Sequence, residues 1–168
     1  MALTFKNVNP ADWSPSWVRS KQPRKQRKYV INAPKHVRRK LIVSPLSKEI
    51  RDIIKLKNLV LIVGDKVKIL RGKFRGKEGS VIYIDTKKYR VYVDSAYIEK
   101  KNGEKSYYPL HASKLMIVKL NLTDKKRLEV IKRRNPNLTD EDVNNLLKIS
   151  ITNREDLSKV YELNKTFK

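Results

Sequence analysis

The sequence contains no cysteine and only two histidines, His36 and His111. Without cysteine there is no disulfide and no thiolate metal site. It also has no Walker-type phosphate loop, no nucleophile elbow and no HExxH motif. Apart from small clusters that suit helix caps, its carboxylates are scattered singly. These absences predict a protein that is not an enzyme and that binds no metal or cofactor of its own.

Long apolar stretches are missing as well. No run of about 18 apolar residues is present, which excludes a transmembrane helix. The first 17 residues, MALTFKNVNPADWSPSW, lack the apolar core of a signal peptide. At 168 residues, the chain has room for one ordinary domain with tails. We expect a cytoplasmic protein.

Acidic residues are scarce relative to basic ones. The chain carries 40 Lys and Arg against 17 Asp and Glu, a formal net charge of +23. A compact monomer with this charge repels itself, and such a charge is most easily tolerated beside a polyanion.

The densest charge lies in residues 19–51, where twelve cations accompany Glu49 alone. Five of the seven prolines precede residue 46, so no long helix is expected, and 19–33 should stay extended until a partner orders it. Helix starts are predicted at 32–34 and at Ser44-Pro45. A charge run is commonly a solvated face or a targeting signal. Here the cations alternate with helix starts and apolar anchors, which favours a folded surface that binds RNA.

Residues 63–93 have the pattern of short antiparallel strands. Alternating β-branched and aromatic residues fall at 67–69, 81–85 and 89–93, separated by turns that contain glycine. The first turn, RGKFRGK at 71–77, places four cations on a backbone that glycine allows to bend tightly. Such a loop suits an anionic polymer, although basic loops are often merely solvated.

The stretch GDKVKILRGKFRGKEGSV at 64–81 resembles the KOW motif, which forms part of a small SH3-like barrel in ribosomal proteins and transcription elongation factors. Further blocks resemble one ribosomal family, the universal large-subunit protein numbered twenty-four, counted as twenty-six in eukaryotes, in its archaeal and eukaryotic form. These blocks are SKQPRKQRK at 20–28, NAPKHVRRKL at 32–41, SPLSKEIRD at 44–52 and HASKLMIVKLNL at 111–122. The first of them is closer to the archaeal form. Ala112 stands where proline is usual in the family.

The resemblance covers about residues 20–133 and implies a mainly β fold, with an SH3-like (KOW) barrel behind a basic arm. It also implies a structural constituent of the large ribosomal subunit, which binds the 5′ domain of the large rRNA near the tunnel exit and acts early in assembly. The implied partners are large-subunit rRNA and neighbouring ribosomal proteins, with no membrane span and no homo-oligomer, and Mg²⁺ only as part of the rRNA. The alternative is a KOW-domain transcription elongation or RNA-processing factor. Such a factor would carry a second domain ahead of the motif and lack the basic, proline-broken arm.

The RNA-binding residues predicted from the arm, the turn and the last strand connection are Lys21, Arg24, Lys25, Arg27, Lys28, Lys35, His36, Arg38, Arg39, Lys40, Lys48, Arg71, Gly72, Lys73, Phe74, Arg75, Gly76, Lys77 and Lys114. Trp13 and Trp17 could either stack on bases or pack locally. Tyr107 and Tyr108 are exposed candidates for base stacking, although cross-strand packing is the commoner role. His111 is expected to form a hydrogen bond within its own turn and not to bind a metal.

The chain divides in this interpretation into a basic arm with short helices (1–55), the barrel (56–120), a basic helix (121–136) and a helical extension (137–168). A hairpin is expected at 96–110 with Asn102-Gly103 at its tip, and a closing strand at 115–120. Thr123-Asp124 should cap the basic helix, with Leu128 and Ile131 inward. The extension, with six acidic and five basic residues, should form two amphipathic helices. The first is capped at 138–142 and buries Val143, Leu146 and Leu147. The second is capped at 152–155 and buries Leu157, Val160 and Tyr161. We expect a helical hairpin that packs on the barrel or docks a neighbouring protein.

Overall fold

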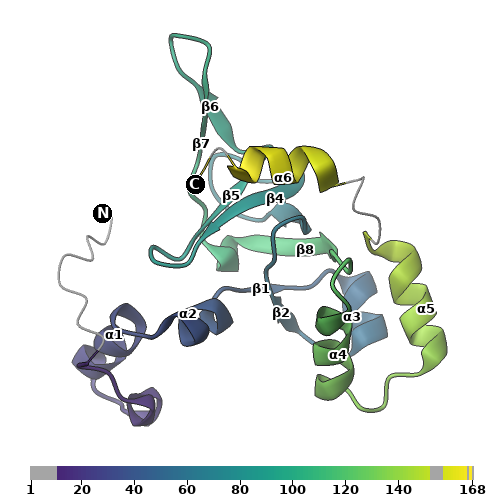
Figure 1. The fold of residues 1–168 in the computed structure, drawn as a ribbon, viewed down its shortest axis with the longest axis horizontal. Helices are drawn as coiled ribbons and strands as arrows, with labels where there is room; N and C mark the ends of the chain where they lie inside the picture. The colour runs from purple at the N-terminus through teal and green to yellow at the C-terminus, as the bar shows by residue number, and fades with distance from the viewer. Residues whose placement is uncertain (1–10, 152–156, 166, 168) are drawn as a thin grey trace.

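A four-stranded antiparallel sheet forms the centre of the protein (Figure 1). The computed structural model describes residues 11–151, 157–165 and 167. The sheet has the order β5-β4-β3-β8, built from β3 (Lys66–Ile69), β4 (Glu78–Asp85), β5 (Arg90–Val93) and β8 (Leu115–Lys119). Two further antiparallel pairs lie beside it: β1 (Val43–Pro45) with β2 (Asn58–Val60), and β6 (Tyr97–Glu99) with β7 (Lys105–Tyr107).

The prediction of a small sheet-rich domain with antiparallel strands is confirmed. Among the described residues, however, strand pairing does not continue from β5 round to β8, so no closed barrel is formed. Two isolated bridges, Val91 with Leu110 and Leu46 with Ile117, connect the sheet to its neighbours. The hairpin expected at 96–110 is present but shorter, and it projects away from the sheet (Figure 1). Its tip is closed by Gly103, whose φ of +79° is in the region that favours glycine.

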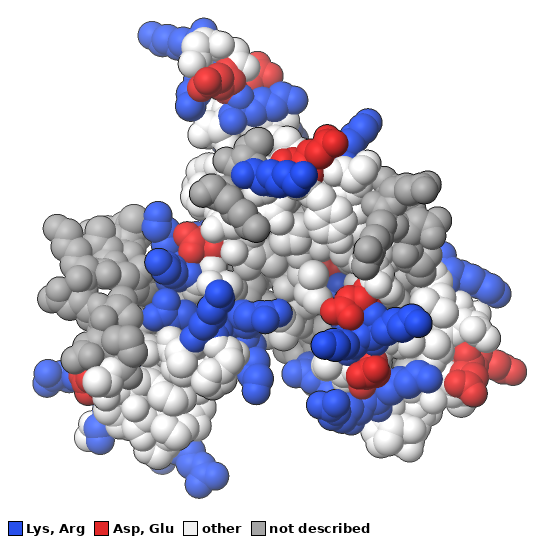
Figure 2. Space-filling view, viewed as in Figure 1, with Lys and Arg blue, Asp and Glu red and all other residues white. Residues whose placement is uncertain are grey.

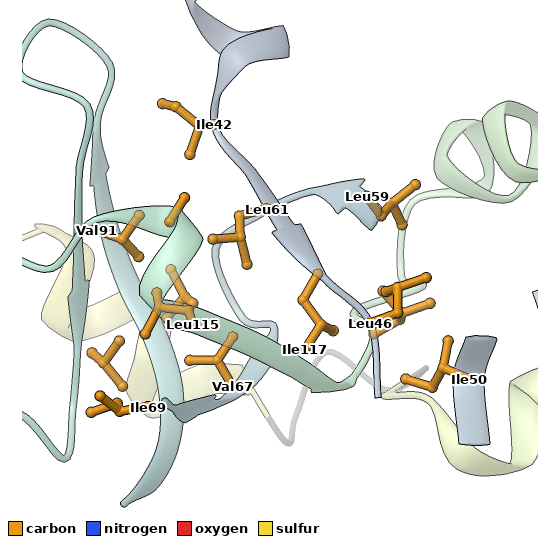
Figure 3. Close-up of a cluster of buried hydrophobic side chains, with 14 of the residues drawn as sticks. Ile42, Leu46, Ile50, Leu59, Leu61, Val67, Ile69, Val91, Leu115 and Ile117 are labelled. Carbon is orange, nitrogen blue, oxygen red and sulfur yellow. The ribbon is translucent and has the colours of Figure 1, made fainter. Parts of the chain in front are cut away.

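The core lies between the sheet, the β1–β2 pair and α3 (Lys48–Ile54). The alternating residues of the strands point inward, so that Val67, Ile69 and Val81 are buried from solvent. Ile50 and Ile54, one turn apart on α3, are also fully buried. Figure 3 shows the isoleucine, leucine and valine side chains of this cluster converging from the four-stranded sheet, the β1–β2 pair and α3.

The N-terminal arm differs from the sequence-based expectation. Segment 19–33 is not extended, because α1 (Pro23–Ile31) follows the 3-10 helix η1 (Pro15–Arg19). Pro23 occupies the first turn of α1, where proline costs no hydrogen bond. The side-chain amide of Gln26 donates to the carbonyls of Trp17 (2.9 Å) and Ser20 (2.6 Å), which fixes η1 against α1.

The next two elements were predicted with mixed success. The helix start at 32–34 is confirmed by α2 (Lys35–Leu41). The start at Ser44-Pro45 is wrong, because these residues belong to β1 and α3 begins at Lys48. Ser44 is buried, and its hydroxyl donates to the carbonyl of Ala112 (2.5 Å). Because the Ser44 hydroxyl is bonded to Ala112, which is distant in the sequence, it is not available to cap a helix.

A buried ion pair joins the sheet to α4 (Lys125–Arg134). The guanidinium of Arg127 forms two hydrogen bonds to the carboxylate of Asp65, which also accepts from the backbone N–H groups of Ile62 (2.9 Å) and Asn121 (2.8 Å). Arg127 donates in addition to the carbonyls of Val60 (3.1 Å) and Asn121 (2.8 Å). Charged groups are rarely buried unless they are paired, so separating this pair would be costly. The network therefore fixes α4 against β2 and the end of β8.

The start of α4 and its buried side agree with the prediction. The carboxylate of Asp124 accepts from the N–H of Lys126 (2.9 Å) and caps the helix. Ile131 is buried and Leu128 partly buried against the core.

The helices of the extension form as predicted but do not pair with each other. In α5 (Asp140–Ile149), Thr139 and Asp142 form a capping box, and Val143 and Leu146 are buried. α5 packs on α3, whereas α6 (Ser158–Lys165) crosses to β4 (Figure 1). The expectation of a helical hairpin is therefore wrong, because each apolar face is covered by a different part of the chain.

The predicted buried residues of α6 were only partly correct. Leu157 and Val160 are buried as predicted. Tyr161 is 37% exposed, so its assignment to the inner face of α6 is wrong. The cap predicted at 152–155 lies outside the described residues. None of the helices in the described part of the chain is long and apolar enough to cross a membrane.

Candidate nucleic-acid interface

The turn between β3 and β4 presents its cations to solvent. Gly72 and Gly76 have φ values of +98° and +86°, which side chains adopt only with strain. The N–H of Gly76 donates to the carbonyl of Ile69 (2.8 Å), and the N–H of Arg75 donates to the carbonyl of Gly72 (3.0 Å). These bonds give the turn a defined shape. Its exposed cations are Arg71, Lys73, Arg75 and Lys77.

Phe74 has a different role from its neighbours in the turn. It is only 6% exposed, and its ring lies 5.6 Å from that of Tyr108. It therefore anchors the turn to the core, and its ring is not exposed as the surrounding cations are. Lys114 is the last residue of η2 (Ala112–Lys114) and lies close to the same turn. Its carbonyl accepts from the N–H of Leu70, which directly precedes the turn (2.8 Å).

The arm carries the second group of predicted residues just before and on α1, on α2 and on the first turn of α3. Most of their side chains are exposed: Lys21, Arg24, Lys25, Arg27, Lys35, His36, Arg39, Lys40 and Lys48. Two cations have internal partners. Lys28 forms an ion pair with Asp12 (2.5 Å), and Arg38 donates to the carbonyls of Ile31 (2.9 Å) and Ala33 (2.6 Å). Arg38 thus fixes the bend between α1 and α2, which sets the direction of the other cations.

One hydroxyl connects the arm to the sheet. Tyr89, in the turn between β4 and β5, donates to the carbonyl of Val30 in α1 (2.7 Å). Burial raises the pKa of Tyr89 above its usual value, which keeps this donor protonated. The arm is therefore docked at the C-terminal end of β4, whereas the 71–77 turn precedes its N-terminal end. An eight-residue strand spans about 26 Å, so the structure places the two predicted groups at separate ends of the sheet.

The aromatic residues considered for base stacking mostly pack internally. Trp13 stacks on Tyr29 at 5.5 Å and donates to its carbonyl (3.1 Å). The ammonium of Lys28 lies 6.0 Å from the ring of Trp17. Tyr107 contacts Tyr97 across the hairpin. Tyr108 is 45% exposed, although its ring touches Phe74.

His111 has a structural role in the turn where it lies. The imidazole Nδ1 of His111 accepts from the N–H of Ser113 (3.3 Å), which confirms its role in the turn. Burial, with smaller contributions from Arg90 and Lys114, lowers the pKa of His111. Across the residues that the structure describes, no three His, Asp or Glu side chains come together as metal ligands would.

A third group of cations was not among the predicted contacts. α4 exposes Lys125, Lys126, Lys132, Arg133 and Arg134. The sequence showed a basic rim on this helix but not what would lie beside it. Figure 2 shows Lys and Arg surface over both α2 and α4, with few acidic groups between them.

Comparison with known proteins identifies close relatives. A family model that describes the ribosomal proteins L26 of eukaryotes and their archaeal L24 counterparts matches residues 20–134. The chain is also similar to a protein named "Large ribosomal subunit protein uL24" from Nanoarchaeum equitans (strain Kin4-M). The two are 58% identical over 130 residues, which cover 77% of this chain and 88% of that protein. Residues 20–55 of the arm, the 71–77 turn and α4 lie within the region matched by the family model, and α5 and α6 lie beyond it.

Proposed function

The chain belongs to the family of ribosomal proteins called L26 in eukaryotes and L24 in archaea, and from this membership we propose how it works. It is a structural constituent of the large ribosomal subunit in the cytoplasm and acts in translation. The observation that carries this function is the family match over 115 consecutive residues, 20–134, together with the relative that is 58% identical. A KOW-domain transcription factor is not favoured by any observation.

The proposed ligand is large-subunit rRNA. The arm and the 71–77 turn would hold it at two separate places, because they lie at opposite ends of β4. Lys and Arg side chains neutralise phosphates, and these contacts supply most of the affinity. Since few free aromatic faces accompany the cations, the shape of the folded rRNA supplies most of the specificity. We propose the residues predicted from the sequence as contacts, with Lys28, Arg38 and Phe74 holding the surface in place.

Three finer points rest on family membership. We propose that the sheet with its flanking pairs corresponds to the SH3-like (KOW) barrel of the family. We also propose that the rRNA site belongs to the 5′ domain near the tunnel exit, and that binding occurs early in assembly beside neighbouring ribosomal proteins. No catalytic step is proposed for any residue.

The salt dependence of rRNA binding tests this proposal. If about six cations contact phosphates, the affinity should fall by roughly a thousandfold between about 50 and 200 mM salt. Deleting residues 1–41, which keeps the buried Ile42 and β1, should lower the slope while circular dichroism still reports a folded sheet. In parallel, the full chain should co-sediment with large subunits at low salt. A flat salt response, or no co-sedimentation at low salt, would refute the proposal.

A further inference from the structure

We propose that a groove between α2 and α4, the α2–α4 groove, binds a single RNA strand along its sugar–phosphate backbone. This inference rests on the proposed function and adds a binding site to it. Arg39 and Lys40 of α2 line one side, and Lys126 and Arg134 of α4 line the other. β2 lies between them, because it contacts α2 and its Val60 carbonyl accepts from Arg127 of α4. The groove has a volume of about 510 Å³.

The α4 side of the groove follows from helical geometry. Lys126, Val130 and Arg134 are four residues apart, so they lie along one face of the helix. The neighbouring face, about 100° round the helix, carries Ile131 and Arg127 into the protein, and Arg127 borders the base of the groove. The Asp65–Arg127 ion pair therefore fixes which face of α4 looks toward α2.

The charges of the groove favour a polyanion. Among the described residues, none of its four outer cations forms an ion pair. Of the described residues that line the groove, Asp124 alone carries a carboxylate, and this carboxylate caps α4. Four free cations facing one another repel each other, and an anionic strand between them removes that repulsion.

The size and lining of the groove define the form of the ligand. Its volume is in the range of pockets that enclose small ligands, which suits a short stretch of one strand and not a duplex. Val130 is 41% exposed, and with Val60 and Ile62 it offers an apolar floor for ribose. None of the described residues that line the groove is aromatic, so the lining gives bases no ring to stack on and recognition is independent of sequence.

A matched pair of variants tests the proposal in the full chain. Lys126→Gln/Arg134→Gln removes two charges that line the groove. Lys125→Gln/Arg133→Gln removes two charges from the same helix that do not line it. With a large-subunit rRNA transcript, the first pair should bind about tenfold more weakly than the second. Its log–log salt slope should also decrease by about 1.4, for two contacts to a single strand.

A second measurement uses the unmodified protein. Binding to the transcript should protect Lys40 and Lys126 from acetylation and leave Lys125 accessible. An oligouridylate should remove this protection by competition, whereas polyglutamate of equal charge should not.

The outcomes distinguish this inference from the proposed function. If the wild-type chain does not bind the transcript, the groove proposal and the proposed function are both refuted. If it binds, but the two variants lose affinity equally or the three lysines are protected alike, the groove proposal alone is refuted. Equal competition by polyglutamate would point to an acidic protein segment and would also overturn it.

Discussion

Replacing Arg127 by methionine should strongly destabilise the protein. The side chain of Asp65 is fully buried and that of Arg127 is 4% exposed. Methionine fills much of the space but leaves a carboxylate in the interior without a counter-charge, and it leaves the Val60 and Asn121 carbonyls without a donor. Breaking a buried ion pair in this way costs about 3–5 kcal/mol. That is a large part of the roughly 5–15 kcal/mol typical of a folded domain.

Urea unfolding followed by circular dichroism measures the effect. With m-values of about 1–3 kcal/mol per M, the midpoint for Arg127→Met should decrease by about 2 M. Arg133→Met, on the exposed side of the same helix, should change the stability by less than about 0.5 kcal/mol. Asp65→Asn/Arg127→Met should be more stable than Arg127→Met, because no unpaired charge remains. A loss below about 1 kcal/mol for Arg127→Met, or a double variant no better than it, would refute this reasoning.

Three further predictions concern the turn, the extension and the histidine. Gly76→Val should weaken rRNA binding in filter assays more than Lys101→Gln, because the φ of +86° strains valine while open space surrounds the added side chain; equal affinities would contradict it. Truncation after Pro136 should lower the melting temperature, since α5 covers α3, yet keep the affinity for naked rRNA within about threefold. A tenfold loss in the folded truncated chain would show that the extension binds RNA. The lowered pKa of His111 means that the folded protein favours neutral imidazole, so stability should decrease as pH falls below about 6.5. His111→Asn should lose this part of the pH dependence in melting curves, and an unchanged pH profile would disprove the assignment.

Local patterns predicted the elements that local interactions form. The strands at 66–69, 78–85 and 90–93 were predicted from alternating apolar residues separated by turns that contain glycine. The capping box of α5 is formed by Thr139 and Asp142, which lie three residues apart in the sequence. β1 and β2 were missed because they have three residues each, and their pairing joins Val43 to Val60 across a helix. α1 was missed because its stability depends on contacts made elsewhere, including the stacking of Trp13 on Tyr29.

The candidate interface was predictable as a set of cations and not as an arrangement. Sequence reasoning identified the basic turn and arm, but side chains such as Lys28 and Arg38 form internal contacts that only the tertiary structure reveals. The position of α4 beside α2 depends on Asp65, a buried carboxylate 62 residues away from Arg127 in sequence. No local pattern encodes such a partner, so the groove could not be anticipated.

The packing of the extension has a consequence for synthesis of the chain. α3 is translated early, but α5 covers it, and the side chain of Leu157 lies so close to Gly64 that a Cβ added there would meet it at 3.1 Å. A nascent chain that has completed the sheet therefore still exposes apolar surface around α3 until α5 has emerged. Chains that stop before α5 keep most of the cations but leave this surface open to proteases. The helix that covers α3 thus makes resistance to proteolysis depend on a segment synthesised well after the strands and cations that it protects.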